Sequence, residues 1–274
     1  MKILILGASG FCGSYIKKYF TDRGYTVYGT YRHFRTAYRE DLYMLPFSVE
    51  ETEKITGILQ EIKPQTVISC LRGDFEQQLK VHEILADYIK EKESRRLFYF
   101  SSANVFDKDT GRPHYEEDQI NAQSEYGQFK GACEELLKTR LRNQVMILRL
   151  PMVLDRECPR IRELEEKNRS GGTVPLYKNV FVNLTTPEQI CQCIQDILRE
   201  DIHGIFHIGT TDMCECASLY IRLAKSLSLE NLEFEMVEEG PLPDYLAVIS
   251  RRESFPKERK MSVEQVIDYL TNPG

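Results

Sequence analysis

The sequence predicts an α/β protein built on a doubly wound parallel sheet, followed by a smaller C-terminal α/β lobe. Three observations lead to this prediction. Short apolar strands alternate with helical stretches over residues 1–150, glycines cluster where the first strand meets the first helix, and the later segment is less regular. Strand–helix alternation builds such a sheet because right-handed crossovers lay the helices on both of its faces.

The elements of the first part follow from hydrophobic periodicity. Strands are predicted at residues 2–6, 26–31, 41–45, 66–70, 95–102 and 144–150, of which 41–45 is the weakest. Helices are predicted at residues 10–24, 50–62, 75–93 and from 124 onward. A helix therefore separates most neighbouring strands, as a parallel sheet requires, although none is predicted between the strands at 26–31 and 41–45.

The later part contains a mixture of elements without a clear order. We predict helices at 156–169, 187–199, 217–228 and 262–270, a turn at "SGGTVP" (170–175), and strands near 180–184 and 204–209. The segment is too short and irregular for an obvious independent fold. Residues 151–274 are therefore predicted to form a smaller lobe interleaved with the domain of residues 1–150.

Composition limits the possible partners. The 274 residues are 42% hydrophobic, enough for a large core, and the net charge of -6 gives no basic field for nucleic acid or anionic lipid. The opening "MKILILG" runs directly into glycine, unlike a secretion signal, and no apolar run approaches the roughly 18 residues of a membrane helix. A cytoplasmic protein with a small-molecule substrate is predicted.

A metal site is not predicted from the eight cysteines. Cys191 with Cys193 and Cys214 with Cys216 form two C-x-C pairs. A helix sends residues two apart to different faces, and no C-x-x-C or nearby histidine set completes a zinc site. Reduced thiols are the expectation.

The segment "LILGASGFCGSYI" predicts a pyrophosphate-binding turn. Gly7, Gly10 and Gly13 lie between the first strand and the first helix, where glycine allows a tight turn and a close approach of the backbone to a ligand. The amides at the start of the helix favour an anion. Candidate cofactor contacts are these glycines with Ser9, Phe11 and Cys12.

The end of the second strand favours NADP(H) over NAD(H). NAD enzymes usually place an acidic residue there, but "GTYRHFR" has none before Glu40. Arg32, with His33 and Arg35 behind it, could pair with a 2'-phosphate. The alternative is that these are solvated surface cations.

Tyr126 and Lys130 lie on one face of a predicted helix as an i,i+4 pair. The apolar stripe of this helix is expected at Phe129, Ala132, Cys133, Leu136 and Leu137, with Tyr126 at its edge and Lys130 about 40° further round. Alone, such a pair is more often a core aromatic and a solvated lysine. Gly127 and Gly131 are expected on the opposite face, where close packing by another helix, including one across a homodimer, or simple tolerance would explain them.

Together these motifs resemble the extended short-chain dehydrogenase/reductase superfamily, of the NAD(P)-dependent epimerase/dehydratase type. The order Gly7-x-x-Gly10-x-x-Gly13, "FSSANVFD" and Tyr126-x-x-x-Lys130 is most similar to the dTDP-4-dehydrorhamnose reductase group. The resemblance implies a Rossmann-type fold and an NAD(P)-dependent oxidoreductase. It makes Tyr126 the proton donor and Ser102 a hydrogen-bond donor to the substrate carbonyl. Lys130 would lower the pKa of the tyrosine and hold the nicotinamide ribose.

The resemblance also implies further cofactor contacts and leaves alternatives open. Cys70, Leu71, Ser101 and Leu150 are expected beside the cofactor, although "SCLRGD" replaces the usual Asn-x-Ala-Ala. His82 stands where the family has a relay Asn, either as a relay or, slightly favoured, as a satisfied helix histidine. From charge alone, Arg72, His114, Arg149 and Arg162 are possible substrate contacts.

The predicted function is NADP(H)-dependent reduction of a keto group on a nucleotide-activated sugar. Ala103 and Asn104 follow Ser102 where dehydratases of the family carry an Asp-Glu pair, so elimination is disfavoured. A nucleotide-sugar 4-epimerase remains possible, although such enzymes usually have a larger substrate lobe. A non-catalytic NADP-binding regulatory subunit is the other alternative.

Overall fold

The computed structural model of the chain describes residues 1–238, 240–253 and 259–271. Within them the chain forms two compact units, each assembled from separate stretches of sequence. The first comprises residues 1–101, 125–148 and 200–206, and the second comprises residues 102–124, 149–199 and the described residues from 207 onward. The units interleave along the chain rather than dividing at one boundary near residue 150.

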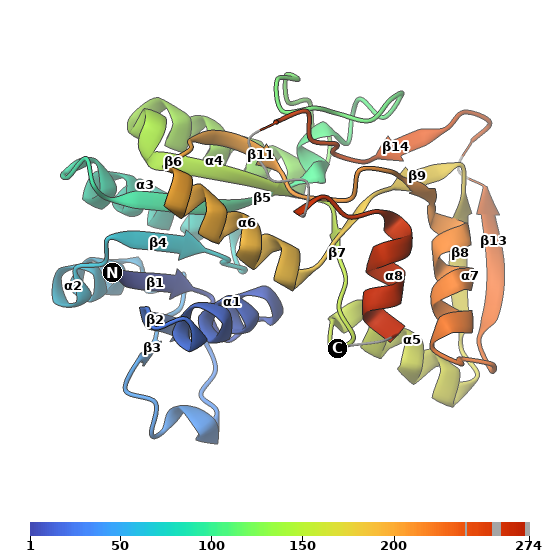
Figure 1. Ribbon diagram of the computed structural model, residues 1–274, viewed down its shortest axis with the longest axis horizontal. Coiled ribbons are helices and arrows are strands. Elements are labelled where there is room, and N and C mark those ends of the chain that lie inside the picture. The colour runs from blue at the N-terminus through green and yellow to red at the C-terminus, as the bar shows by residue number, and fades with distance from the viewer. Residues whose placement is uncertain (239, 254–258, 272–274) are drawn as a thin grey trace. The chain divides into compact units, whose positions relative to one another are not determined.

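A large parallel sheet confirms the predicted α/β class. Its seven strands are β1 (Lys2–Leu6), β2 (Thr26–Tyr31), β3 (Met44–Pro46), β4 (Thr66–Ser69), β5 (Arg96–Ser102), β6 (Val145–Leu150) and β11 (Gly204–His207). They follow the order β11-β6-β5-β4-β1-β2-β3, and the neighbours from β3 to β5 pair in parallel. Figure 1 shows these strands side by side, with β3 at the lower edge.

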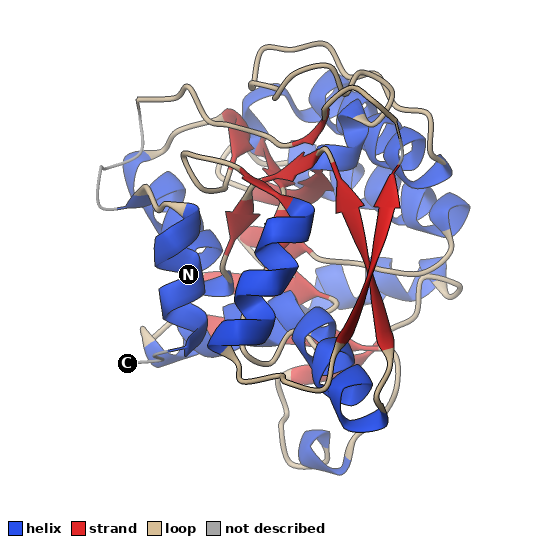
Figure 2. Ribbon diagram, turned by 90° about the vertical axis from the view of Figure 1, so that its right-hand side faces the viewer, coloured by secondary structure: helices blue, strands red, loops and turns tan. Residues whose placement is uncertain are grey.

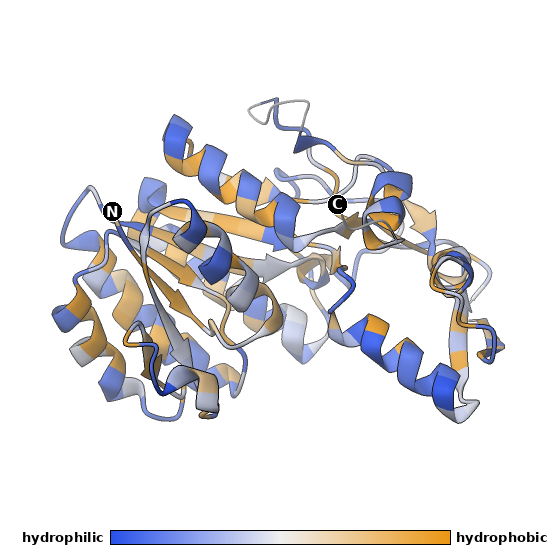
Figure 3. Cartoon of the chain, turned by 60° about the horizontal axis from the view of Figure 1, so that its bottom comes forward, coloured by the Kyte–Doolittle hydropathy of each residue, from blue (hydrophilic) through white to orange (hydrophobic). Residues whose placement is uncertain are grey.

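Helices connect the strands of the first unit. They are α1 (Phe11–Asp22), α2 (Thr52–Ile62), α3 (Phe75–Lys90) and α4 (Glu125–Leu141), with the short 3-10 turns η1 (Thr36–Tyr38) and η3 (Arg142–Gln144). The 3-10 turn η2 (Ala103–Phe106) belongs to the second unit. Leu4, Val67 and Leu97 of the strands pack with Leu59 and Leu85 of α2 and α3 in one buried core. The central strands are accordingly orange in the hydropathy view of Figure 3. This core holds the carboxyl ends of β1, β4 and β5 in fixed positions.

The second unit contains smaller sheets. Its strands are β7 (Met152–Val153) with β10 (Leu184–Thr185), β8 (Thr173–Lys178) with β13 (Glu233–Glu238), and β9 (Val180–Val182) between β12 (Cys214–Glu215) and β14 (Asp244–Leu246). Its helices are α5 (Pro159–Ser170), α6 (Pro187–Glu200), α7 (Cys216–Ser226) and α8 (Val263–Thr271). Figure 2 shows β8 and β13 as two parallel arrows that twist across each other.

The predicted turn at residues 170–175 is wrong for most of its length. Gly171, with φ of +65°, ends α5, but β8 starts at Thr173 and runs through Pro175. Proline is tolerated there because β8 belongs to a two-stranded sheet, where each strand has a free edge. The partner strand, β13, lies far along the sequence, so no local pattern predicts this pairing.

In the part of the chain that the structure describes, no helix is both long enough and apolar enough to cross a bilayer.

Candidate active site

The turn after β1 requires glycine at two of its three glycine positions. Gly7 has a φ of +81°, and a Cβ there would lie 2.7 Å from the Cys70 carbonyl oxygen. A Cβ on Gly13 would lie 2.3 Å from the Gly7 carbonyl oxygen. The turn is held by bonds from the Gly7 amide to the Thr30 hydroxyl (2.9 Å) and from the Gly10 amide to the Gly7 carbonyl (3.0 Å). These contacts bring β1, β2, β4 and α1 together at one point.

The start of α1 suits an anionic group such as a pyrophosphate. Gly10 is its N-cap and offers no side-chain cap, and the first turn contains no acidic residue. A Cβ on Gly10 would meet only the Gly7 carbonyl oxygen, at 3.3 Å. Ser9, Phe11 and Cys12 are half-buried around it. The positive end of the helix dipole is therefore available to a phosphate, as a dinucleotide site requires.

Arg32 and His33 lie on the surface just after β2. The Arg32 guanidinium lies 3.3 Å from a carboxylate oxygen of Glu50, and both side chains are about half exposed. A surface pair of this kind contributes at most about 1 kcal/mol. It leaves the guanidinium able to exchange its partner for a phosphate.

The segment after β4 lies against the glycine turn. The Cys70 amide donates to the Leu6 carbonyl at 2.9 Å, and Cys70 and Leu71 are half-buried. The Ser69 hydroxyl lies 2.9 Å from His82 Nε2, and His82 Nδ1 lies 2.6 Å from the Gln78 carbonyl oxygen. Because a carbonyl can only accept, Nδ1 carries the proton and Nε2 accepts from Ser69. His82 is thus a satisfied helix histidine.

Burial keeps His82 neutral. The imidazole is fully buried, and this loss of hydration, together with the nearby Lys130 cation, lowers its pKa from 6.5 to about 4. Its ring packs edge-on against Tyr99, with the ring centroids 4.9 Å apart.

Tyr126 and Lys130 are brought together by α4 in contrasting environments. Tyr126 is 41% exposed, whereas Lys130 is 6% exposed and donates from Nζ to the Phe100 carbonyl at 2.8 Å. Nζ lies 5.7 Å from the centroid of the Tyr126 ring. Burial lowers the pKa of Lys130 from 10.5 to about 8. The pair therefore consists of an accessible phenol beside a buried ammonium group.

The expected buried stripe of α4 is partly wrong. Phe129, Cys133 and Leu137 are buried, but Ala132 is exposed. Gly127 and Gly131 are buried as well, with α3 packed against α4 within the same unit. The helix is covered by both α3 and β5, so its buried face is wider than the apolar residues indicate. Both glycines are buried within the single chain, so they provide no argument for a homodimer.

Glu134 is a buried acidic residue near the candidate site that was not predicted from the sequence. It lies on α4 four residues after Lys130, is 1% exposed, and accepts a hydrogen bond from the Ser101 hydroxyl. Ser101 therefore contacts α4 directly, in addition to its predicted place beside the cofactor. In the sequence, Glu134 could have been recognised by its i,i+4 spacing from Lys130, which continues the spacing from Tyr126.

Ser102 ends β5 and belongs to the second unit. Its hydroxyl donates to Asn104 Oδ1 at 2.9 Å and accepts from the Asn104 amide at 3.2 Å. Nearby, the Asp107 carboxylate accepts from the amides of Gln123 (2.7 Å) and Ser124 (3.3 Å) and from the Ser124 hydroxyl. Asp107 thus fixes the residues that immediately precede α4.

Arg149, a candidate substrate contact from its charge, is buried in the second unit. It is 2% exposed, its guanidinium carbon lies 4.9 Å from the Phe106 ring centroid, and Nη1 lies 3.4 Å from both the Glu116 carbonyl oxygen and His207 Nε2. Burial and this cation lower the pKa of His207 from 6.5 to about 3. Leu150, the next residue, is also buried at the end of β6.

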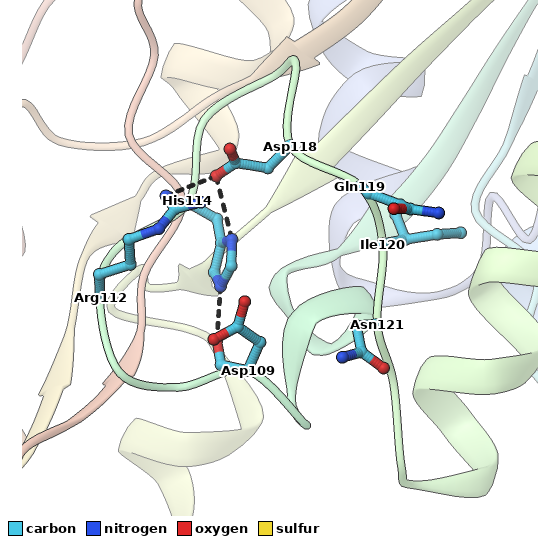
Figure 4. A pocket seen from close by; sticks show the side chains of 7 residues that line it. All are labelled: Asp109, Arg112, His114, Asp118, Gln119, Ile120 and Asn121. Carbon is cyan, nitrogen blue, oxygen red and sulfur yellow. Dashed lines mark hydrogen bonds and ion pairs between the residues drawn. The ribbon is translucent and has the colours of Figure 1, made fainter.

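His114 is likewise buried, beside a polar cavity of about 400 Å³ (Figure 4). Its Nδ1 lies 3.0 Å from an Asp118 carboxylate oxygen, and its Nε2 donates to the Asp109 carbonyl. The hydrogen bond from Arg112 is the main reason why the pKa of Asp118 is well below its usual range. Arg112 is exposed and lines this cavity.

No set of three His, Cys, Asp or Glu side chains in the described residues is arranged to hold a metal ion. Burial raises the pKa of Cys193 to about 12 and that of Cys214 to about 11, so both thiols stay protonated at neutral pH.

Comparisons with known proteins identify a matching family and a distant relative. The model of the NAD dependent epimerase/dehydratase family matches residues 3–154. The probable low-salt glycan biosynthesis reductase Agl14 of Haloferax volcanii is 21% identical over 227 residues, which are 77% of this chain and 75% of that protein.

Solved structures share the fold over nearly the whole chain. A dTDP-4-dehydrorhamnose reductase from Bacillus anthracis, in complex with NADP, has a TM-score of 0.78 at 16% identity and covers 98% of each chain. A UDP-glucose 4-epimerase from Thermus thermophilus, in complex with NAD, has a TM-score of 0.81 at 17% identity and covers 99% of this chain and 98% of its own. At these identities the likeness shows the fold.

Proposed function

The chain belongs to the NAD dependent epimerase/dehydratase family, and from this premise we propose that it is an NADP(H)-dependent reductase of a keto group on a nucleotide-activated sugar. The observation that carries the proposal is the accessible Tyr126 beside the buried ammonium of Lys130. The reductases named among the similar proteins, Agl14 and the dTDP-4-dehydrorhamnose reductase, support it. Residues 1–150 would bind the cofactor and residues 151–274 the substrate, in the cytoplasm.

In this proposal, Tyr126 donates its phenolic proton to the carbonyl oxygen, and Ser102 donates a hydrogen bond to the same oxygen. The reduced nicotinamide, when bound, supplies the hydride for the carbonyl carbon. The Lys130 ammonium stabilises the tyrosinate that remains after proton transfer. A shift of two to three pKa units in a tyrosine corresponds to about 3 to 4 kcal/mol, which is reasonable for a close charge in a site with little water.

The experiment that tests this function measures NADPH oxidation with a panel of 4-keto nucleotide sugars. Tyr126→Phe should lower kcat by about 100- to 10,000-fold, the usual contribution of general acid catalysis. Tyr43→Phe changes an exposed tyrosine after β2 and serves as the matched control. An unchanged rate in Tyr126→Phe would exclude the proposed role.

The same panel separates the alternative functions. Interconversion of 4-epimers without net NADPH oxidation would indicate an epimerase. NADPH binding with no hydride transfer to any member would indicate a regulatory subunit.

We also propose that Arg32 selects NADPH over NADH by pairing with the 2'-phosphate. Arg32→Ala should raise the KM for NADPH by about tenfold, the effect of 1.4 kcal/mol, and leave the KM for NADH unchanged. Glu50→Gln removes the present partner of Arg32 and should lower the KM for NADPH instead. Equal changes for both cofactors would contradict this assignment.

A further inference from the structure

Three aromatic rings lie around the ammonium group of Lys130 in the first unit. Its Nζ lies 4.9 Å from the ring centroid of Tyr99, 5.5 Å from that of Phe129 and 5.7 Å from that of Tyr126. A cation within about 6 Å of an aromatic centroid is attracted by the negative face of the ring. The ammonium group therefore lies in a partial aromatic cage.

Tyr99 is the nearest of the three rings, and it comes from a different element. Phe129 and Tyr126 lie on α4 with Lys130, whereas Tyr99 lies on β5 and is 1% exposed. The carbonyl of the next strand residue, Phe100, accepts a hydrogen bond from Lys130 Nζ at 2.8 Å. Two successive residues of β5 thus supply a ring face and a carbonyl oxygen to the same ammonium group.

Burial makes the contact with the Tyr99 ring stronger than it would be at the surface. Lys130 is 6% exposed, and a cation–π contact contributes more where water does not screen the cation. Burial also raises the pKa of the Tyr99 phenol well above its usual value, so this phenol stays neutral. Tyr99 therefore acts on the ammonium group through its ring and not as an anion.

Other titratable or charged groups also face Lys130. They come from the segment after β4, from α3 and from α4, and they are Cys70, Arg72, His82, Tyr126, Cys133 and Glu134. These groups stay in place when only the electron density of the Tyr99 ring is changed. Such a change therefore isolates the contribution of the ring.

We propose that Tyr99 is a positioning residue whose ring face holds the Lys130 ammonium at the Phe100 carbonyl. This inference deepens the proposed function and rests on it for its catalytic meaning, because Lys130 is the lysine that acts on Tyr126. The contact itself can be measured without turnover, since it joins one buried cation to one buried ring.

The test changes the electron density of the ring while its size and burial stay almost the same. Tyr99→Phe keeps the ring face, and monofluorophenylalanine or trifluorophenylalanine at the same position weakens its negative charge in steps. NMR of the full-length protein with 13C-labelled lysine, with the Lys130 signal assigned by Lys130→Arg, gives the titration midpoint of the ammonium group. From Tyr99→Phe to the trifluorinated ring, the midpoint should fall stepwise by about 0.4 to 1.5 pH units, the strength of a cation–π contact.

Phe98 provides the matched control, because it is buried on the same strand and its side chain points to the opposite face of the sheet. Trifluorophenylalanine at position 98 should leave the midpoint of Lys130 unchanged. Equal midpoints across the series at position 99, or an equal fall with the control, would overturn the proposal. A fall in Tyr99→Phe itself as large as that with the trifluorinated ring would assign the effect to the hydroxyl and overturn the role of the ring.

The outcome is separable from that of the reductase assay. A stepwise midpoint in a protein that reduces no keto sugar would count against the proposed function alone. An unchanged midpoint in a protein that does reduce one would count against the role of Tyr99 alone. In an active enzyme, the pH profile of kcat should shift with the Lys130 midpoint along the fluorinated series, which a purely structural role would not produce.

Discussion

In the described residues, each unit buries a cation beside a neutral histidine, but the cation is a lysine in one unit and an arginine in the other. In the first unit, the lysine cluster consists of Lys130, Glu134, Ser101 and His82. In the second, the arginine cluster consists of Arg149, Glu116, His207 and Phe106. Burial lowers the pKa of Lys130 to about 8, whereas an arginine stays charged at every physiological pH.

Because of this difference, the Lys130 ammonium suits a chemical role and the Arg149 guanidinium suits a structural one. A lysine that titrates near neutral pH can respond to its surroundings, and its neighbour Tyr126 is open to solvent. In the arginine cluster, the Glu116 carboxylate accepts from the amides of His207 (3.2 Å) and Arg251 (3.0 Å) and from the Ser250 hydroxyl (2.6 Å). Its polar groups hold three chain segments together.

The largest expected effect comes from removing Glu116. Glu116→Ala leaves the three donors without their acceptor and should lower the free energy of unfolding by about 3 to 5 kcal/mol, as for a broken buried charge network. Urea denaturation measures it, with Glu117→Ala at the neighbouring exposed position as the control. Equal stability of the two variants would show that the arginine cluster is not structural.

An intermediate effect is expected when a lysine replaces Arg149 in the arginine cluster. Arg149→Lys loses part of the stacking on Phe106 and should destabilise the protein by about 1 to 3 kcal/mol at pH 7. The pKa of the buried lysine would lie below the pKa of the same lysine in the unfolded chain, so the unfolded chain keeps this proton to a higher pH. The loss of stability relative to the protein with Arg149 should therefore become smaller between about pH 8 and pH 10. A constant deficit over this range would mean that the substituted lysine is not buried.

Near neutral pH, the smallest effect concerns the two histidines and tests where the clusters behave alike. Both folded pKa values, about 4 for His82 and about 3 for His207, lie below the unfolded value of 6.5. The unfolded chain therefore takes up protons first as the pH falls, and stability is lost below pH 6.5. Each histidine contributes up to about 1.4 kcal/mol per pH unit to this loss.

His82→Asn and His207→Asn should each reduce the slope of the free energy of unfolding against pH below pH 6.5. The reduction equals the contribution of the one histidine that is replaced. Urea denaturation at several pH values between 6.5 and 4 measures the slope. An unchanged slope in either variant would show that its histidine is protonated in the folded protein.

The sequence predicted the first unit more closely than the second because its signals are local. The bounds of β1 and β2 agree with the predicted strands, since each is a short apolar run ended by a turn. The pairing of β8 with β13 joins distant segments, one of which contains Pro175, and no local pattern reveals it. A prediction from hydrophobic periodicity also places charged residues at the surface, so it does not identify buried ones.

The sequence predicted the motif residues of the candidate site but not the buried positions of its other polar side chains. Tyr126 and Lys130 do lie together at α4, as their spacing indicated. The buried positions of Glu134 and Arg149 depend on hydrogen bonds to β5 and to the loop of Glu116, which sequence periodicity does not contain. His82 could be placed on its helix, but its tautomer required the positions of Ser69 and Gln78.

The interleaving of the two units has a consequence for synthesis of the chain on the ribosome. The edge strand of the large sheet, β11, ends at His207, long after the other six strands have emerged. Until then β6 has an unpaired edge, which is a template for wrong pairing with other chains. A fragment that stops at residue 150 keeps that edge permanently. Expression of such a fragment should therefore give aggregates, and the molecule matures as a whole rather than unit by unit from its N-terminus.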